Sequence, residues 1–476
     1  MSFLRVGVAK ADITPPVGTR MAGYIQRRFV SKGIHDRLFA KVLYLSDNQT
    51  EAALVSIDSL AVDRKLTRTI RDRIEQTMGI PGEQVNIAAT HTHSGPSGLA
   101  ELSFGGGYDD SLLGFTVSQI AKAVQQAREG VFEARLKAGS TAVTGLTQNR
   151  SDPTQTIDEQ LHVLRIEDAE GRLRAVLANY PCHPTFLGFD NLMISADWPG
   201  AVCAIVEKVL DEDVVVMMTN GASSDIHPMY LSQSPEDIQR MGQVLGGTIL
   251  TVLGQLWPLG NKLRVQNQRW GIEMETEPHY GRLIAQPCVR LLQRRVSLPL
   301  KEFRSKQAYD EEIDALRARL LSLGFDDETL TVMVENPGAD LSGVTCLDEA
   351  HYDLLATLNA LLSERMERDH ALTKSQGKHT QEIDLRLLSL DPGLAVLFIP
   401  GELSSRIGLA IKQRNSLTNL IIMACANDYV GYLIPAAEYP IGGYDVGVSH
   451  FSAQVETVLI QAALDLIAEA CSKDTH

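Results

Sequence analysis

Short apolar runs alternate with amphipathic stretches along the first 260 residues, and this alternation constrains the fold more than any other feature. Short runs rich in Val, Ile and Ala are typical of buried strands, whereas apolar residues three and four positions apart predict helices. Because elements mixed in this way pack in layers, the sequence predicts an α/β (α+β) fold. The strand-like runs are 6–9, 38–45, 52–57, 85–89, 136–143, 161–166, 173–179 and 214–218, and the helical stretches are 63–78, 115–127, 201–210 and 235–256.

The pattern changes near residue 265, where two charged helical stretches, 311–323 and 347–368, flank a loop containing Asn336-Pro337-Gly338. We predict that residues 266–379 form a helical hairpin, inserted into or capping a main domain of residues 1–265 and 380–476. The charged run 364–369 within it is expected to face solvent. After residue 382 strands and helices resume, at 385–390, 394–399, 404–412, 420–424 and 454–470.

Composition and charge exclude several classes of protein. A net charge of −15 argues against a nucleic-acid-binding surface. No apolar run approaches the roughly 18 residues of a membrane span, and no leader-like segment opens the chain. We therefore expect a cytoplasmic protein without stable membrane insertion, and the sequence leaves homo-oligomerisation open. None of the six cysteines forms a Cys-x-x-Cys pair, which argues against a thiolate zinc site.

Two histidines follow the run 85–89 in the string Thr90-His91-Thr92-His93-Ser94-Gly95-Pro96. Because alternate residues of a strand point to the same face, His91 and His93 are expected to face one cleft. Two imidazoles at this spacing suit zinc. The alternative is an ordinary pair of histidines at a strand end, bonded to neighbouring loops.

Three more strand-like runs are followed by residues that can bind a metal. His183 lies between two prolines, Glu402 precedes a helix, and Tyr432 ends the motif 427–432. Each has an ordinary alternative, namely a stiff loop, a favourable charge at a helix N-terminus, and a packed tyrosine. Four such clusters indicate a shared rim, although the sequence alone does not show that they converge.

Taken in order, these motifs resemble the catalytic domain of the neutral/alkaline (non-lysosomal) ceramidase family. The resemblance runs from about residue 5 to residue 465 except for the helical insertion, and the string from Thr90 to Pro96 is its most specific part. From this resemblance we expect a catalytic domain without the C-terminal sandwich domain or the leader of the long ceramidases. The matching stretches are 6–14, 21–24, 33–38, 55–58, 90–96, 149–151, 183, 194–200, 220–228, 400–402 and 427–432.

The resemblance implies stacked mixed β-sheets flanked by helices, with one Zn²⁺ ion at the floor of a pocket. It assigns the metal ligands to His91, His183, Glu402 and Tyr432. It also places His93 and Arg150 near the scissile group, and Tyr432 is expected to assist the leaving amine. Arg150 could equally anchor a substrate carboxylate or form a structural ion pair.

Several other residues are expected to support this site. Asp58, Asp197 and Asp225 are expected to bond the free ring nitrogens of the ligand histidines. His35 is expected at the pocket edge, or alternatively in a surface loop. Asn220, Ser223 and Ser224 complete the predicted pocket. The histidines left as structural are His162, His227, His279, His351, His370, His379 and His450.

The family cleaves the amide bond of ceramide, but this sequence departs from it at one position. Characterised ceramidases carry a serine four residues before the aspartate that corresponds to Asp225, and here that position is Gly221. We therefore predict a zinc-dependent hydrolase that cleaves an N-acyl amide by metal-bound hydroxide, acting on a small or medium N-acyl compound. The alternatives are true ceramidase activity on lipid, an esterase or lactonase, and a non-catalytic zinc-binding protein.

Overall fold

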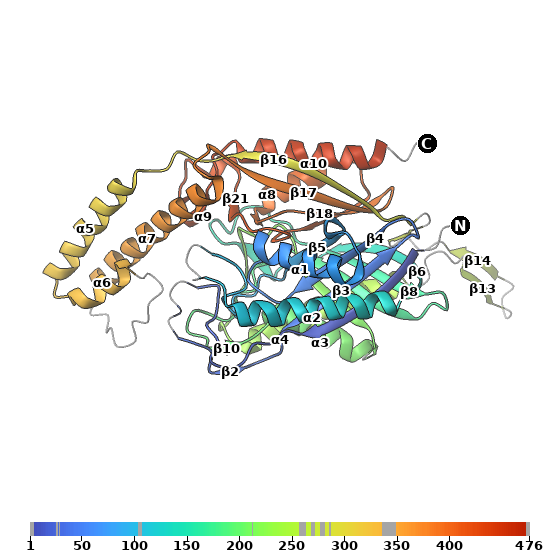
Figure 1. Ribbon diagram of the computed structural model, residues 1–476. Coiled ribbons are helices and arrows are strands. Elements are labelled where there is room, and N and C mark those ends of the chain that lie inside the picture. The colour runs from blue at the N-terminus through green and yellow to red at the C-terminus, as the bar shows by residue number, and fades with distance from the viewer. Residues whose placement is uncertain are drawn as a thin grey trace.

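Two β-sheets stack face to face between layers of helices in the computed structural model (Figure 1). The predicted class, stacked mixed sheets flanked by helices, is confirmed. The structure describes residues 4–24, 27, 29–102, 107–211, 213–256, 263–267, 272–276, 281–284, 287–335 and 349–472.

The larger sheet has nine strands in the order β11-β9-β8-β6-β1-β3-β4-β5, with β15 also paired to β6. Most neighbours are antiparallel, but β4 with β5 and β9 with β11 are parallel pairs. The strands are β1 (Leu4–Asp12), β3 (Phe39–Ser46), β4 (Glu51–Ile57), β5 (Val85–Ala89), β6 (Phe132–Ala142), β8 (Gln160–Asp168), β9 (Leu173–Tyr180), β11 (Val215–Asn220) and β15 (Arg282–Leu283).

Side chains of the larger sheet alternate between two apolar cores. In β3, Leu43 and Leu45 pack toward the second sheet, whereas Val42 and Tyr44 pack toward helices. This two-residue period follows from the pleat of a strand. Both faces are buried, which explains why the sequence shows nearly continuous apolar runs here.

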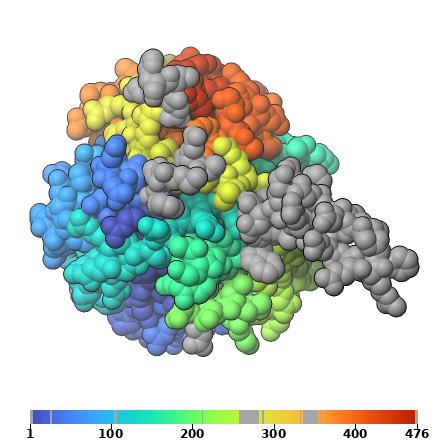
Figure 2. All heavy atoms as spheres, turned by 90° about the vertical axis from the view of Figure 1, so that its right-hand side faces the viewer, coloured from blue at the N-terminus to red at the C-terminus, as the bar shows by residue number. Residues whose placement is uncertain are grey.

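The smaller sheet has the order β16-β17-β18-β20, in strands Arg290–Pro299, Thr380–Asp391, Leu394–Phe398 and Asn419–Met423. Phe398 and Met423 pack against the larger sheet. The opposite face of the smaller sheet packs on α8 (Ser405–Arg414) and α10 (Val455–Ser472). Figure 2 shows this C-terminal layer, orange to red, covering one side of the N-terminal half.

Four helices cover the outer face of the larger sheet. Helices α1 (Arg64–Met78) and α2 (Asp110–Glu129) share one core with β3 and β4, and α3 (Asp197–Leu210) and α4 (Pro235–Leu256) share another with β9 and β11. Asp63 caps α1 by accepting a hydrogen bond from Leu66 N. That helix ends at Gly79, whose φ of 69° suits a residue without a Cβ.

A helical hairpin projects from the body at the left of Figure 1. It contains α5 (Lys306–Ser322), α6 (Asp327–Glu335) and α7 (Glu349–Ser375), which share an apolar core that includes Ile313, Leu320 and Leu358. The predicted range 266–379 also includes β16, which is an edge strand of the smaller sheet, so the helical part begins only at Lys306. The predicted connecting loop 336–338 lies outside the described residues.

No helix among the described residues is both long enough and apolar enough to span a bilayer.

Short elements complete the fold. The remaining elements are β2 (Gly33–Ile34), β7 (Thr147–Asn149), β10 (Met193–Ile194), β12 (Ile226–Pro228), β13 (Leu263–Asn267), β14 (Ile272–Thr276), β19 (Glu402–Leu403), β21 (Tyr432–Leu433), α9 (Tyr444–Val448), and the 3-10 turns η1 (Gly82–Gln84) and η2 (Ala436–Glu438).

Candidate metal centre

The candidate site lies where the ends of strands from both sheets meet. Ala89 at the end of β5 donates its N–H to the carbonyl of Cys425, just beyond β20. Ala424 donates likewise to Asn220 at the end of β11. These backbone bonds tie the two sheets together at one edge, so loops distant in sequence meet there.

His91 and His93 lie beyond the end of β5, in a loop rather than in the strand. Their rings are nevertheless close, with centroids 4.9 Å apart. The expectation from strand alternation is therefore wrong in its reason, because His91 has a left-handed backbone with φ of 70°. Such a conformation is unfavourable for a residue with a side chain and is often found at functional sites.

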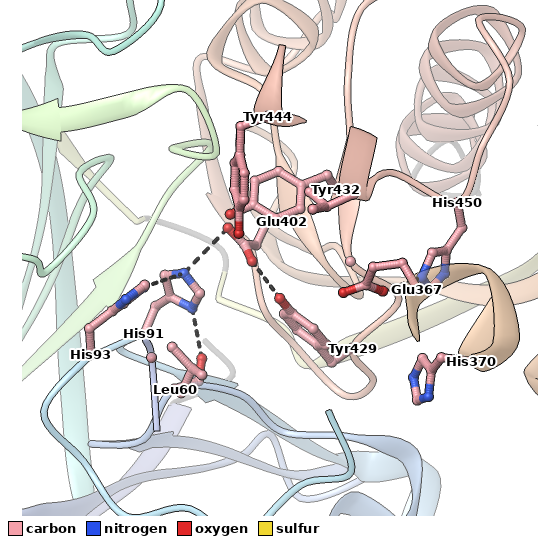
Figure 3. Close-up of a pocket in the computed structure, with 13 residues that line it drawn as sticks. Leu60, His91, His93, Glu367, His370, Glu402, Tyr429, Tyr432, Tyr444 and His450 are labelled. Carbon is pink, nitrogen blue, oxygen red and sulfur yellow. Dashed lines mark hydrogen bonds and ion pairs between the residues drawn. The ribbon is translucent and has the colours of Figure 1, made fainter. Parts of the chain in front are cut away.

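The ligand-type atoms of three residues converge on one point. Nε2 of His183 lies 3.2 Å from Oε2 of Glu402, and Nε2 of His91 lies 3.4 Å from the same oxygen. All three side chains are at most 4% exposed. The structure therefore brings together three of the four predicted ligands (Figure 3 shows His91 and Glu402).

The other ring nitrogens fix how these histidines point. Nδ1 of His91 donates to the carbonyl of Leu60 over 2.7 Å, and Nδ1 of His183 donates to the carbonyl of Ser223 over 2.7 Å. With Nδ1 protonated, a neutral ring presents the lone pair of Nε2 to Glu402. This is the arrangement in which histidine binds a metal.

Glu402 and Tyr432 are brought side by side by backbone pairing. Glu402 in β19 is the register partner of Tyr432 in β21 in a short parallel pair. A Cβ on the preceding Gly401 would lie 2.7 Å from the carbonyl oxygen of Gly431, so this close approach requires glycine. The structure thus places the fourth predicted ligand beside the third.

The spacing of the three atoms fits a bound cation better than hydrogen bonding. Oε2 of Glu402 and Nε2 of His183 are both buried without a hydrogen-bond partner. Ligands bound tetrahedrally to zinc at about 2.0–2.1 Å lie roughly 3.3 Å from one another. The separations of 3.2 and 3.4 Å match that value, so the residues present fit a zinc ion.

His93 is close enough to be a further ligand. Its Nε2 lies 3.4 Å from Nε2 of His91, and His91, His93 and His183 form a group that could hold a metal ion. The resemblance places His93 beside the substrate instead. Burial, and then the charge of His91, lower the pKa of His93 well below its usual range, so His93 is neutral and can serve either purpose.

Arg150, which is partly exposed, forms an ion pair with the buried carboxylate of Asp445. Its guanidinium carbon lies 5.4 Å from the ring centre of Tyr432 and 5.5 Å from that of Tyr444. The structural alternative for Arg150 is thus present in the structure. The same contacts hold the guanidinium group of Arg150 beside the ring of Tyr432.

The predicted carboxylate partners of the ring nitrogens are wrong. Backbone carbonyls take that place, because the chain turns back under each ring. The carboxylates hold loops instead, since Asp58 accepts from Phe39 N and Asp197 accepts from Trp198 N. Asp225 likewise accepts from the N–H and hydroxyl of Ser405, close to Glu402 in the chain.

The other predicted pocket residues differ in their placement. Asn220 accepts from Cys182 N and donates to the carbonyl of Thr90, so it links the two histidine loops. Ser223 contributes its backbone carbonyl to His183, and Ser224 donates its N–H to Leu403. His35 is exposed and is not among the described residues that line the cavity.

A cavity of about 40 Å³ opens beside the candidate metal-binding atoms (Figure 3). Sequence analysis missed several residues that line it or support it. Tyr429 donates its hydroxyl hydrogen to Oε1 of Glu402. Its position in the motif 427–432 was the available signal. The other residues missed at the cavity are Glu367, His370, Tyr444 and His450.

Burial and neighbouring charges shift the pKa values of several groups around the cavity. Burial alone would raise the pKa of Glu402, but His91 and His183 hold that pKa well below its usual range. Burial alone would lower the pKa of His91, but Cys425 and Glu402 raise it. Burial, and then Glu402, raise the pKa of Tyr432 well above its usual range. A cation at this point would relieve the burial of the Glu402 charge.

Comparison with known proteins agrees with this fold. Residues 4–230 match the family model described as neutral/alkaline non-lysosomal ceramidase, N-terminal. The neutral ceramidase of Drosophila melanogaster is 29% identical over 228 residues, or 43% of this chain and 32% of that protein. The neutral ceramidase of Pseudomonas aeruginosa is 30% identical over 222 residues, or 41% and 32%. The match thus spans about a third of each relative.

The whole chain shares its fold with one of these relatives. The crystal structure of neutral ceramidase from Pseudomonas aeruginosa superposes with a TM-score of 0.70 and 18% identity, covering 99% of this chain and 75% of that chain. The fold and the cluster of histidines define a mixed α/β protein with a candidate metal centre. The match to the neutral/alkaline non-lysosomal ceramidase family covers its N-terminal part, residues 4–230.

Proposed function

We propose that this protein is a zinc-dependent hydrolase that cleaves an N-acyl amide bond. One observation carries the proposal most directly: Oε2 of Glu402 and Nε2 of His183 are buried, face each other and have no hydrogen-bond partner. Leaving such groups unpaired is costly unless a ligand satisfies them. The sequence similarity to neutral ceramidases supports amide hydrolysis as the reaction.

In this proposal His91, His183 and Glu402 hold the zinc ion, and Tyr432 is the fourth ligand. A bound zinc ion supplies an activated water molecule and polarises the carbonyl group of the substrate. The carbonyls of Leu60 and Ser223 keep the two rings oriented. Tyr429 keeps Glu402 oriented through its other oxygen.

Arg150 and His93 lie beside these ligands and would act on the substrate. Arg150 keeps a positive charge next to Tyr432, where it can stabilise negative charge that develops on the carbonyl oxygen. Neutral His93 can donate a hydrogen bond to the reacting group or accept one from it. Asp445 positions Arg150 by pairing with it.

A second candidate is hydrolysis of ceramide itself. The similarity to neutral ceramidases of several organisms favours it. The small volume of the cavity, about 40 Å³, favours a compact N-acyl compound instead. We therefore propose the compact substrate first.

The test is hydrolysis by the zinc-loaded full chain. Short N-acyl amides and ceramide are assayed side by side, with release of the amine as the readout, for the wild type and for Glu402→Ala. The proposal predicts release from short N-acyl amides by the wild type and none by the variant. If the wild type releases amine only from ceramide, the second candidate replaces the first. If it releases none from any substrate, the proposed function is wrong.

A further inference from the structure

The helical hairpin supplies part of the cavity wall. Glu367 and His370, both on α7, line the cavity together with His450. Figure 3 shows these three side chains on the other side of the cavity from His91 and His93. The composition of the charged run 364–369 predicts a face exposed to solvent. The structure differs from this prediction, because Glu367 lines the cavity.

Glu367 is held in place by a buried partner. Nε2 of His450 donates to Oε2 of Glu367 over 2.6 Å. His450 is 1% exposed, and its Nδ1 is buried without a hydrogen-bond partner. The ring of His370 lies 5.9 Å from that of His450, centre to centre. This wall thus combines a fixed carboxylate with imidazole nitrogens that can accept hydrogen bonds.

The wall is also fixed relative to the metal centre. Nζ of Lys374, near the end of α7, donates to the carbonyl of Tyr429 over 2.7 Å. Tyr429 is the residue that bonds Glu402. The position of α7 is therefore coupled to the residues that would hold the zinc ion.

The lining of the cavity carries several polar side chains. Among the described residues that line it, aliphatic side chains come from Leu60 and Val448, and most of the others are histidine, glutamate or tyrosine. Cleavage of an amide gives a carboxylate and an amine, and the carboxylate of Glu367 repels the first and attracts the second. The amine portion of the substrate is thus the part that suits this wall.

We propose that Glu367, held by His450, accepts a hydrogen bond from a hydroxyl group on the amine portion of the substrate. This inference rests on the proposed function and names the part of the substrate that α7 selects. A site built to bond a hydroxyl group discriminates strongly against an analogue that lacks it, because its own polar groups are then left unpaired. Glu367 would therefore be a specificity-determining residue contributed by the helical hairpin.

The test measures binding of two product-like amines of equal shape to the zinc-loaded full chain by calorimetry. The amines are 2-amino-1,3-propanediol and 3-aminopentane, which differ by replacement of hydroxyl with methyl groups. We expect the diol to bind about tenfold more tightly or better, as a hydrogen bond to a charged group implies. In Glu367→Gln this preference should fall to a few-fold, while Asp369→Asn, an exposed change on the same helix, should keep it.

For the wild type, two results would overturn the inference: equal affinity for both amines, and no binding of either. A preference that Glu367→Gln retains in full would also overturn it. The melting curve of each variant shows whether it folds. The comparison of the two amines on the wild type is valid even if a variant does not fold. Because binding needs no turnover, this result is separate from the hydrolysis assay that tests the proposed function.

Discussion

Tyr429 donates a hydrogen bond from its hydroxyl group to Oε1 of Glu402, whose other oxygen, Oε2, faces His91 and His183. One carboxylate therefore has one oxygen held by the protein and one directed at the candidate metal position. Groups that orient a ligand in this way fix its geometry and contribute to metal affinity.

Replacing Tyr429 by Phe should weaken zinc binding without abolishing it. Loss of such an orienting hydrogen bond typically costs about 10–100-fold in metal affinity. Competition with a chromophoric chelator measures the change. Tyr309→Phe, in the core of the helical hairpin, is the control and should bind zinc like the wild type. Unchanged affinity in Tyr429→Phe would show that Glu402 does not depend on this bond.

Replacing Glu402 by Gln should remove both zinc and hydrolytic activity. The change keeps the shape of the side chain but deletes the charge that faces His91 and His183, so we expect at least about a 100-fold loss of zinc affinity. Metal analysis and amine release are the two readouts. A variant that keeps one zinc ion per chain would contradict the assignment of Glu402 as a ligand.

The layers and most long elements could be predicted from sequence because their apolar periods are strong. The buried run 85–89 and the helix with Leu66, Ile70 and Ile74 occur where the pattern places them. Strand β16 could not be recognised, because this edge strand carries Arg290, Arg294 and Arg295 and lacks a clear apolar period. Its partner β17 follows only after the whole helical hairpin.

The site could be predicted only in part. His91, His183 and Glu402 follow strands, and strand ends share an edge, so their convergence follows from topology. The acceptors of the ring nitrogens could not be predicted, because backbone carbonyls such as those of Leu60 and Ser223 have no sequence signature. Glu367 could not be predicted either. The sequence of a charged helix does not indicate which of its residues face solvent and which face a cavity, because this depends on how the helix packs.

Replacing both Ser223 and Ser224 by Ala should leave activity within a few-fold of the wild type. His183 uses the backbone carbonyl of Ser223, which alanine retains. The hydroxyl of Ser224 is buried without a hydrogen-bond partner, so its loss breaks no bond. Amine release under single-turnover conditions checks this. If the wild type accumulates an acyl-enzyme early in the reaction and the double variant does not, a serine is the nucleophile instead.

Replacing His370 by Phe should make the protein less sensitive to acid. Burial, and then the charge of Lys374, lower the pKa of His370 to about 4, whereas an unfolded histidine has a pKa of about 6.5. Between these values the unfolded chain binds the extra proton, so this residue's contribution to stability is lost as the pH falls from about 6.5 toward 4.

The drop in melting temperature between pH 7 and pH 5 should thus be smaller in His370→Phe than in the wild type. His379→Phe, at an exposed position, is the control and should show the wild-type drop. Because other groups titrate in the same range, the comparison between variants carries the test. An identical drop in all three proteins would contradict burial of a neutral His370.

Zinc titration of the chelator-treated full chain tests the central claim most directly. The geometry of His91, His183 and Glu402 predicts that the wild type binds one zinc ion per chain, and that His183→Ala binds it far more weakly while His379→Ala binds it normally. Wild-type protein that takes up no zinc, or a His183→Ala variant that binds zinc as tightly as the wild type, would contradict the account.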